Sequence, residues 1–248
     1  MISWRALFAL LGFACAAPAW ALGGLADLSV YDRTEGKPLR VYWHEGRAYV
    51  VGKPGNEYQL ALRNRAGEDV LAVVSVDGVN VVSGETAAPS QSGYVLEPSR
   101  ALEIRGWRKS LAEIAAFYFT ALPDSYAART GRPENVGVVG VAVFRRKASP
   151  PPAPLAESAP PAAMRSRGSG AADVARSAQA PLGTGHGRRE ASQAYYAAFE
   201  RASSAPAEVV TLYYDSYANL VARGVIRQPA PYAPPPRPFP GFVPDPQG

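Results

Sequence analysis

Cysteine is all but absent from this chain of 248 residues, which contains a single one, Cys15. Cys15 lies in an N-terminal stretch that we expect to be removed on export. A mature chain without cysteine has no disulfide, no thiol nucleophile and no cysteine-ligated metal. The stability of the protein must then come from a hydrophobic core, and the roughly 125 residues before the proline-rich region are enough for one domain.

The N-terminus has the parts of a secretory signal peptide. A short start up to Arg5 carries one positive charge, residues 6–17 are apolar, and Ala19-Trp20-Ala21 supplies small residues for signal peptidase. We therefore expect residues 1–21 to be cleaved near Ala21 and the mature protein to be periplasmic or secreted. The alternative is a lipid anchor on Cys15, but the residues before it match the leucine-rich lipobox poorly.

The sequence also lacks a cluster of like charges and a long hydrophobic run. The 26 basic and 21 acidic residues give a formal net charge of +5 and are spread along the chain. A nucleic-acid-binding domain gathers its basic residues on one face, so we expect no nucleic-acid partner. No stretch approaches the roughly 18 continuous apolar residues of a membrane helix, so we expect no transmembrane span. The sequence favours no particular oligomeric state.

Short strands separated by turns fill the region up to residue 147. His44-Glu45-Gly46 lies between two strands, and Asp77-Gly78 between apolar runs is the strongest hairpin signal in the chain. “NVGVVGVAVF” (135–144) is apolar on both faces, which is typical of a central strand. This pattern predicts a mostly-β domain over residues 22–147, an antiparallel β-sandwich of immunoglobulin-like or jelly-roll-like type. The other strands are expected at 39–43, 47–51, 58–63, 70–76, 93–96, 101–104 and 114–120.

The composition changes after residue 147, because most of the 24 prolines follow it. We expect residues 148–182 to form a disordered Pro/Ala/Ser-rich linker and residues 228–248 to form a proline-rich disordered tail. The island between them, residues 183–227, contains a strand at “EVVTLYYDS”. Its segment “ASQAYYAAFERA” (191–202) fits either a strand or a helix. We favour the strand, because it would give “EVVTLYYDS” a hairpin partner.

The island is only about 40 residues long, too short to form a core of its own. Its many apolar residues predict that it docks back on the sandwich, as a β-hairpin followed by a short helix. “GTGHG” (183–187) is then the turn that delivers it. Similar stretches at 123–131 and 214–224, each containing Asp-Ser-Tyr-Ala and ending in glycine, predict two acid-capped helical turns.

“GTGHGRRE” (183–190) is the stretch that looks most like an active-site loop. A dinucleotide fingerprint needs a third glycine where Arg188 stands, and a P-loop needs Gly-Lys-Ser/Thr. His186 has no neighbouring histidine or cysteine with which to bind a metal. We therefore expect no catalytic, cofactor or metal site here, and interpret the stretch as a glycine-rich re-entry of the chain whose arginines are solvated or paired.

No other motif indicates a catalytic residue or a metal ligand. Asp77, Asn80 and Glu85 in “DGVNVVSGE” lack the ligand spacing of an EF-hand, so a hairpin is expected there. No GxSxG nucleophile elbow is present. Acidic residues occur throughout, and no spacing singles out a catalytic pair.

“IRGWRKS” (104–110) sets Trp107 among the basic residues Arg105, Arg108 and Lys109. An aromatic ring beside such residues can bind sugars or anionic polymers through stacking and charge-assisted hydrogen bonds. These four residues are therefore a candidate ligand-binding site. The other interpretation, which we favour for Trp107 itself, is that its ring anchors the loop in the core.

Five stretches of the chain resemble a family of uncharacterised exported proteins of proteobacteria. They are “VVSVDGVNVVSGE”, “GYVLEP”, “IRGWRKS”, “SYAARTGRPENVGVVGVAVF” and “GTGHGRRE”. The resemblance covers both parts of the chain that we expect to be ordered and skips the linker. No activity or site residue is assigned to that family, so the resemblance implies export and order, and no function.

Three functions from different classes fit the sequence. The preferred one is a non-catalytic interaction or structural module that contacts an envelope protein or polysaccharide. The second is a carbohydrate- or peptidoglycan-binding module, which should place aromatic rings on its surface. The third is a carboxylate-based hydrolase, which should hold two carboxylates in a cleft, one with a raised pKa.

Overall fold

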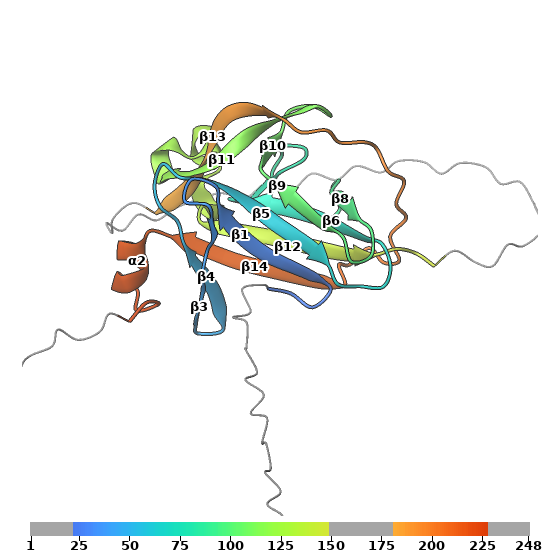
Figure 1. Ribbon diagram of the computed structural model, residues 1–248, viewed down its shortest axis with the longest axis horizontal. Helices are drawn as coiled ribbons and strands as arrows, with labels where there is room; N and C mark the ends of the chain where they lie inside the picture. The colour runs from blue at the N-terminus through green and yellow to red at the C-terminus, as the bar shows by residue number, and fades with distance from the viewer. Residues whose placement is uncertain (1–21, 149–180, 228–248) are drawn as a thin grey trace, which may run out of the picture.

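The computed structural model describes residues 22–148 and 181–227, and in them two β-sheets of seven strands each pack face to face (Figure 1). The predictions for residues 1–21, 149–180 and 228–248 lie outside the described residues. The prediction of a mostly-β sandwich with a short C-terminal helix is confirmed.

The first sheet contains β1 (Ala26–Asp32), β2 (Lys37–Pro38), β5 (Glu57–Asn64), β9 (Ala101–Ile104), β10 (Gly106–Arg108), β11 (Glu113–Ala121) and β13 (Leu182–Ala191). The second contains β3 (Val41–His44), β4 (Arg47–Val51), β6 (Val70–Val76), β7 (Val79–Asn80), β8 (Tyr94–Leu96), β12 (Val138–Arg145) and β14 (Glu208–Asp215), and the helices are α1 (Tyr126–Arg129) and α2 (Tyr217–Ala222).

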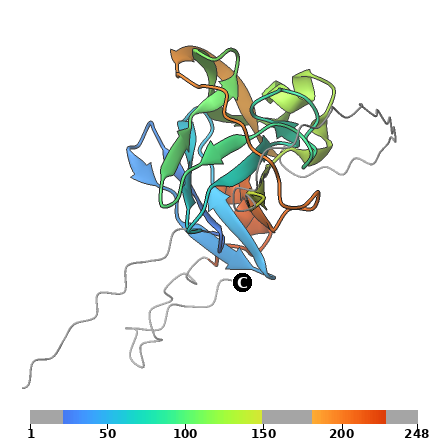
Figure 2. The same cartoon turned by 90° about the vertical axis from the view of Figure 1, so that its right-hand side faces the viewer.

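Non-local pairing dominates the order of the strands. In the first sheet the order is β10-β11-β5-β1-β2, with β13 beside β11 and β9 beside β5. In the second sheet it is β3-β4-β14-β12-β6-β7, with β8 beside β6. Figure 2 shows the two layers from the side of the molecule. In the part of the chain that the structure describes, no helix is long and apolar enough to cross a membrane.

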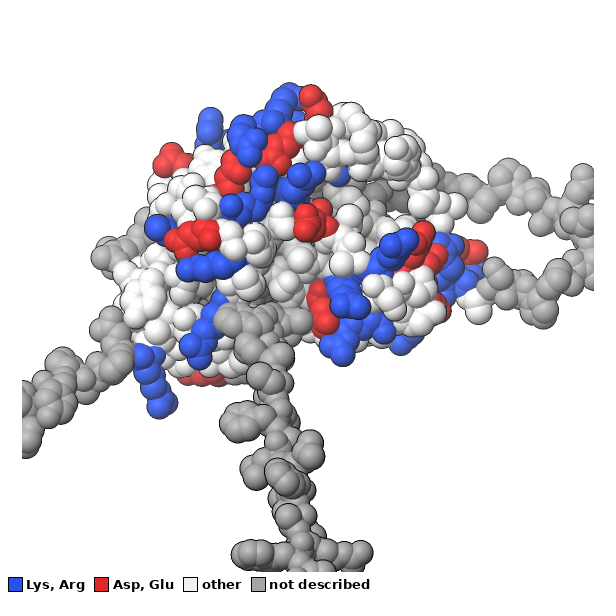
Figure 3. Space-filling view, viewed as in Figure 1, with Lys and Arg blue, Asp and Glu red and all other residues white. Residues whose placement is uncertain are grey.

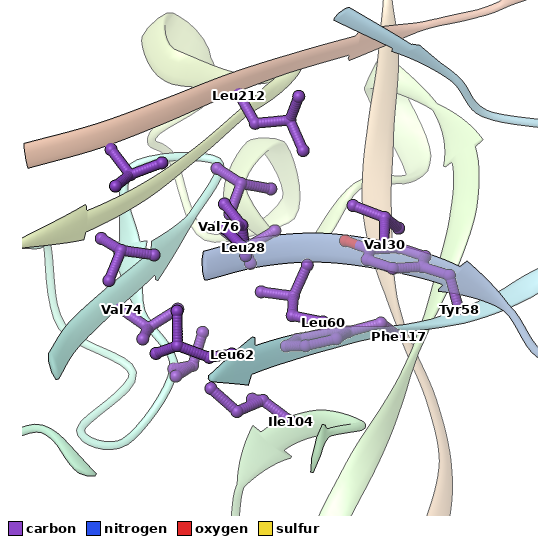
Figure 4. Close-up of a cluster of buried hydrophobic side chains, with 14 of the residues drawn as sticks. Leu28, Val30, Tyr58, Leu60, Leu62, Val74, Val76, Ile104, Phe117 and Leu212 are labelled. Atoms are coloured by element: carbon purple, nitrogen blue, oxygen red, sulfur yellow. The ribbon is translucent and has the colours of Figure 1, made fainter. Parts of the chain in front are cut away.

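Alternating burial builds the inner face of the first sheet. In β1 and β5 every second side chain is buried, which is the pattern of a strand with one face on the core. β6 and β12 are buried on both faces, because Val95 and Phe199 pack against a second cluster formed by Leu71, Val73, Ala142 and Phe144. The side chains that meet between the sheets include Leu28, Val30, Leu60, Leu62, Val74, Val76 and Leu212 (Figure 4).

Two predicted hairpin turns are confirmed. Glu45 and Gly46 have φ of 48° and 72°, and Asp77 and Gly78 have φ of 52° and 72°. Two successive left-handed residues form the tight turn that matches the twist of antiparallel strands. The turns join β3 to β4 and β6 to β7.

Serines rather than acids cap the two helical turns. Ser125 accepts a hydrogen bond from the backbone N–H of Ala128, and Ser216 from that of Asn219. The expectation of acid caps was wrong, because the serine already occupies the position just before each helix. Each turn is followed by a glycine with positive φ, as predicted.

“GTGHG” is part of a strand, and the expectation that it forms a turn was wrong. β13 runs for ten residues and pairs antiparallel with β11 from Leu182 to Ala191. Its glycines lie where neighbours leave no space for a side chain. A Cβ on Gly183 would lie 2.6 Å from Cβ of Ser125, and one on Gly187 would lie 2.7 Å from the carbonyl oxygen of Ala116. Close approach therefore explains the glycine content.

The island does not form the expected hairpin. β13 joins the first sheet, whereas β14 lies inside the second sheet, antiparallel to β12 and parallel to β4. The chain between them, residues 192–207, makes no ladder, so the preference for a strand over residues 191–202 was wrong beyond Ala191. Backbone hydrogen bonds tie it to the sandwich instead, for example from Ala194 to Leu111 and from Ala207 to Val143.

Candidate functional site

Trp107 lies in the core. The residue is 2% exposed, and its ring packs edge-on against Phe117 and beside Tyr126, with centroid distances of 5.1 and 5.0 Å. Its indole N–H lies 3.5 Å from the carbonyl oxygen of Gly185. Trp107 therefore anchors the loop in the core, which is the interpretation that the sequence favoured. A ring enclosed in this way offers no face to a sugar, so Trp107 does not form the stacking platform that the sequence suggested.

The basic neighbours of Trp107 hold the end of β13. Arg108 donates to the carbonyl oxygen and the hydroxyl of Ser192, at 2.5 and 3.1 Å, and Arg105 donates to the carbonyl of Ala191 at 3.2 Å. Lys109 is exposed and makes no ion pair within the described residues. The four candidate residues therefore do not converge on a common ligand position.

Charged residues of “GTGHGRRE” form ion pairs, which is one of the two arrangements that the sequence left open. Arg33 binds both oxygens of Glu190, at 2.9 and 3.1 Å, and Arg188 binds both oxygens of Glu57, at 2.8 and 3.1 Å. Arg188 also lies 2.7 Å from Glu190, and its hydrogen bond to Glu57 is the main reason why the pKa of Glu57 is below its ordinary value. Basic and acidic side chains interleave across the face that Figure 3 shows. These charges largely neutralise one another.

A chain of hydrogen bonds in the core centres on Asp77. Tyr214 donates to one carboxylate oxygen, Gly137 donates its N–H to the same oxygen at 2.9 Å, and Thr184 donates its N–H to the other at 2.7 Å. The hydroxyl of Thr184 lies 2.6 Å from the hydroxyls of Tyr214 and Tyr58. This chain, which we call the core network, joins both sheets. The sequence located Asp77 in a turn but contained no sign that its carboxylate faces inward.

Burial raises the pKa of Asp77 to about 6, against the hydrogen bonds from Tyr214, Thr184 and Gly137, which lower it. Asp77 and Thr184 are completely buried, and Tyr58 and Tyr214 are 1% and 3% exposed. The network is thus closed to a substrate. The core network therefore serves to link the two sheets.

An open groove of about 430 Å³ lies between the chain that leads from β1 to β4 and the start of α2. Tyr217 is 49% exposed there, and the guanidinium of Arg40 lies 5.3 Å from the ring centre of Tyr42. The groove combines aromatic surface with charged groups, which is the mixture typical of sites that bind sugars or anionic chains. Its lining residues are Asp32, Glu35, Lys37, Pro38, Leu39, Arg40, Tyr42, Val51, Lys53 and Tyr217.

Glu35 holds two lysines at the groove. Its carboxylate lies 2.7 Å from Nζ of Lys37 and 3.0 Å from Nζ of Lys53. The hydrogen bond from Lys37, followed by that from Lys53, lowers the pKa of Glu35 to about 2. Asp32, 1% exposed, accepts from the side-chain amide of Asn56 and from the backbone of Glu35, each at 2.8 Å. The groove therefore presents ionised, already paired groups.

The carboxylates of the described residues do not form the pair that a hydrolase would need. A general acid at neutral pH needs a raised pKa, whereas that of Glu35 is lowered. The carboxyl with the raised pKa, Asp77, is enclosed in the core rather than in the groove. The third function considered from the sequence thus has no site of the expected kind in this part of the chain.

Residues 22–148 and 181–227 contain no group of three or more His, Cys, Asp or Glu residues that could hold a metal ion. In the loop after Asp77, the amide of Asn80 is already engaged, since its oxygen accepts from the backbone of Val82 at 2.7 Å. Its nitrogen donates to the side chain of Gln91 at 3.1 Å. These contacts brace a hairpin.

No protein-family model, curated protein or solved structure matches this chain. The groove residues could not be recognised in the sequence, because only the fold brings Tyr217 next to Lys37 and Lys53, which are more than 160 residues away in the chain. The only local signal was their charged and aromatic character, which many surface residues share.

Proposed function

We propose that this protein is an exported, non-catalytic binding module of the bacterial envelope, and that the groove binds a polysaccharide. Export rests on the signal-peptide pattern of residues 1–21 and would place the mature chain in the periplasm or outside the cell. The observation that carries the proposal is the groove, because it sets the exposed ring of Tyr217 beside Tyr42, Lys37 and Lys53.

The chemistry of the groove suits a glycan with acidic groups, such as peptidoglycan. A tyrosine ring stacks on the apolar face of a sugar, while its hydroxyl remains available to hydrogen-bond. Lys37, Lys53 and Arg40 outnumber Glu35 and Asp32 along the lining, so the groove favours an anionic chain.

The test is calorimetric titration of the mature protein with soluble peptidoglycan strands, muropeptides and neutral glucans. We expect binding of the peptidoglycan fragments and a loss of roughly threefold to tenfold, that of one stacking contact, in Tyr217→Ala. Tyr196→Ala is the matched control, because Tyr196 is 92% exposed and lies outside the groove lining. Equal affinity of the two variants, or no binding of any glycan, would reject the groove as the site.

A second candidate function is binding of an envelope protein. The feature that favours it is the β3–β4 hairpin. β3 is an edge strand of the second sheet, and Trp43 on it is 66% exposed. An edge strand with a large exposed aromatic residue is a typical place for a partner strand to add. Crosslinking from a photoreactive residue at position 43 in intact cells should then capture one defined protein. Crosslinks to peptidoglycan alone would favour the glycan proposal.

A further inference from the structure

A second depression, of about 280 Å³, lies at the other conspicuous motif, “GTGHGRRE”. It is lined by Tyr126, Arg129, Thr130 and His186, which we call the basic pocket. His186 comes from β13, and the other three come from α1 and the residue after it. The rings of Tyr126 and His186 lie side by side, with a centroid distance of 5.4 Å.

Unused donors gather at the basic pocket, and no carboxylate lines it. Within the described residues, the guanidinium of Arg129 forms no ion pair or hydrogen bond, although the arginines of the neighbouring β13 are paired. The hydroxyl of Tyr126 likewise has no hydrogen-bond partner in this part of the chain. It lies next to Gly84, where an added Cβ would be 3.6 Å from it. An unpaired arginine that lines the same depression as a tyrosine and a histidine supplies the kind of donors that recognise an oxyanion.

The surroundings of the pocket are positive. The pKa of His186 is below its ordinary value, first because of burial and then because of the charges of Lys109, Arg189 and Arg129. Glu113 offsets the charge of Arg189, at 2.8 Å, but Lys109 and Arg129 have no such partner among the described residues. A bound anion would be stabilised by the same charges that disfavour a proton on His186.

The framework of the pocket is fixed before any ligand binds. Tyr126 rests on the buried ring of Trp107, and Arg132, 6.0 Å from the centre of the Tyr126 ring, is held by two hydrogen bonds to Thr130 of 3.2 and 2.9 Å. A β-bulge follows His186, because the pairing with β11 shifts by one residue there. Bulges of this kind redirect side chains at binding sites. Pre-ordered groups lose little entropy on binding.

We propose that the basic pocket binds a phosphate-type oxyanion through Arg129, Tyr126 and His186. The guanidinium offers two parallel donors, and the phenol and imidazole offer one each, which suits the several oxygens of a phosphate group. The source can be free phosphate or a phosphorylated sugar, since both present the same group. This site is separate from the groove and does not depend on the proposed glycan function.

Histidine resonances give a direct test, because the chain contains only two histidines. Isotope-labelled mature protein is titrated with inorganic phosphate at neutral pH, and the imidazole signals of His186 and His44 are followed by NMR. We expect saturable shifts of His186 and none of His44, which lies at the β3–β4 turn. Acetate and chloride at the same ionic strength should shift neither signal strongly. Glucose 1-phosphate binding more tightly than phosphate would identify a phosphorylated sugar, and the reverse order would identify free phosphate.

Variants decide whether the pocket is responsible. Arg129→Gln should weaken phosphate binding at least about tenfold, as expected for the loss of a charge-assisted bidentate contact. Arg63→Gln is the matched control, because Arg63 is also exposed, forms no ion pair in the described part of the chain, and does not line the pocket. Tyr126→Phe keeps the ring and removes one donor, so a smaller loss is expected. Equal shifts of both histidines, equal binding of acetate, or unchanged binding in Arg129→Gln would overturn the proposal, whatever the outcome of the glycan titrations.

Discussion

Tyr214 donates its phenolic hydrogen to the carboxylate of Asp77, a residue 137 positions earlier in the chain. Asp77 lies in the hairpin turn after β6 and Tyr214 lies near the end of β14, so the bond ties the two parts of the second sheet together. Thr184 extends the link to β13 in the first sheet. The core network thus fastens the C-terminal strands to the rest of the sandwich.

Burial of Asp77 should make the stability of the protein fall as the pH rises. Its pKa is about 6 in the folded protein and 3.8 as the ordinary value, so between these pH values the folded state binds more protons than the unfolded state. The contribution is fully present below pH 3.8 and is lost as the pH passes about 6. The shift corresponds to about 3 kcal/mol in the free energy of unfolding. Urea unfolding of wild type and Asp77→Asn across this range measures it.

The difference in unfolding free energy between wild type and Asp77→Asn reports on Asp77 alone. Glu35 and Glu57, whose lowered pKa values act in the opposite direction, are present in both proteins. An asparagine side chain does not titrate, so the slope assigned to Asp77 should be missing from the variant. Parallel curves would show that Asp77 keeps its ordinary pKa in the core.

Tyr214→Phe should destabilise the protein by about 1–3 kcal/mol, because a buried acceptor and a buried hydroxyl each lose a partner. The ring itself remains packed against Phe119, whose centre is 5.5 Å away, so little apolar contact is lost. Tyr196→Phe, at a residue that is 92% exposed, should leave the unfolding midpoint unchanged. Equal midpoints for the two variants would mean that the core network adds nothing to stability.

Gly183→Ala should cost about 1–3 kcal/mol through overpacking. The added methyl group would lie 2.6 Å from Cβ of Ser125 and 2.8 Å from Cγ1 of Val136, and neither of these atoms is the end of a flexible chain. Gly67→Ala provides the control, because nothing lies within 4 Å of a Cβ at that position. Chemical denaturation of both variants checks the prediction, which fails if Gly183→Ala is as stable as Gly67→Ala.

Residues 22–148 alone should not unfold cooperatively. β14 pairs with β12 on one side and β4 on the other, so its removal leaves both neighbours with unpaired backbone groups. The fragment also lacks the core residues Val210, Leu212 and Tyr214. Thermal melting followed by near-UV circular dichroism should show no sharp transition, and adding a peptide of residues 181–227 should restore one. A fragment that melts as sharply as the whole chain would show that the island is dispensable.

Local sequence chemistry determined the strands with one buried face and the tightest turns. β5 follows from alternation, because side chains of a strand point to opposite faces in turn. β1 alternates in the same way but was not among the predicted strands. The turn at Asp77-Gly78 follows from two residues that accept positive φ, and the turn between β3 and β4 follows from Gly46. These features depend on neighbours in the chain, so they can be recognised in the sequence alone.

The tertiary structure alone decided the rest. Glycine-rich β13 is a strand because it pairs with β11, and propensity gives no sign of that pairing. Its glycines lie where Ser125 and the backbone of Ala116 approach closely. β11, β13 and α1 enclose Trp107, and the sequence, which favoured a core position for this ring, could not name the segments that cover it. The groove and the basic pocket each combine side chains more than 50 residues apart, and their chemistry exists only where the packing of two sheets brings those segments together.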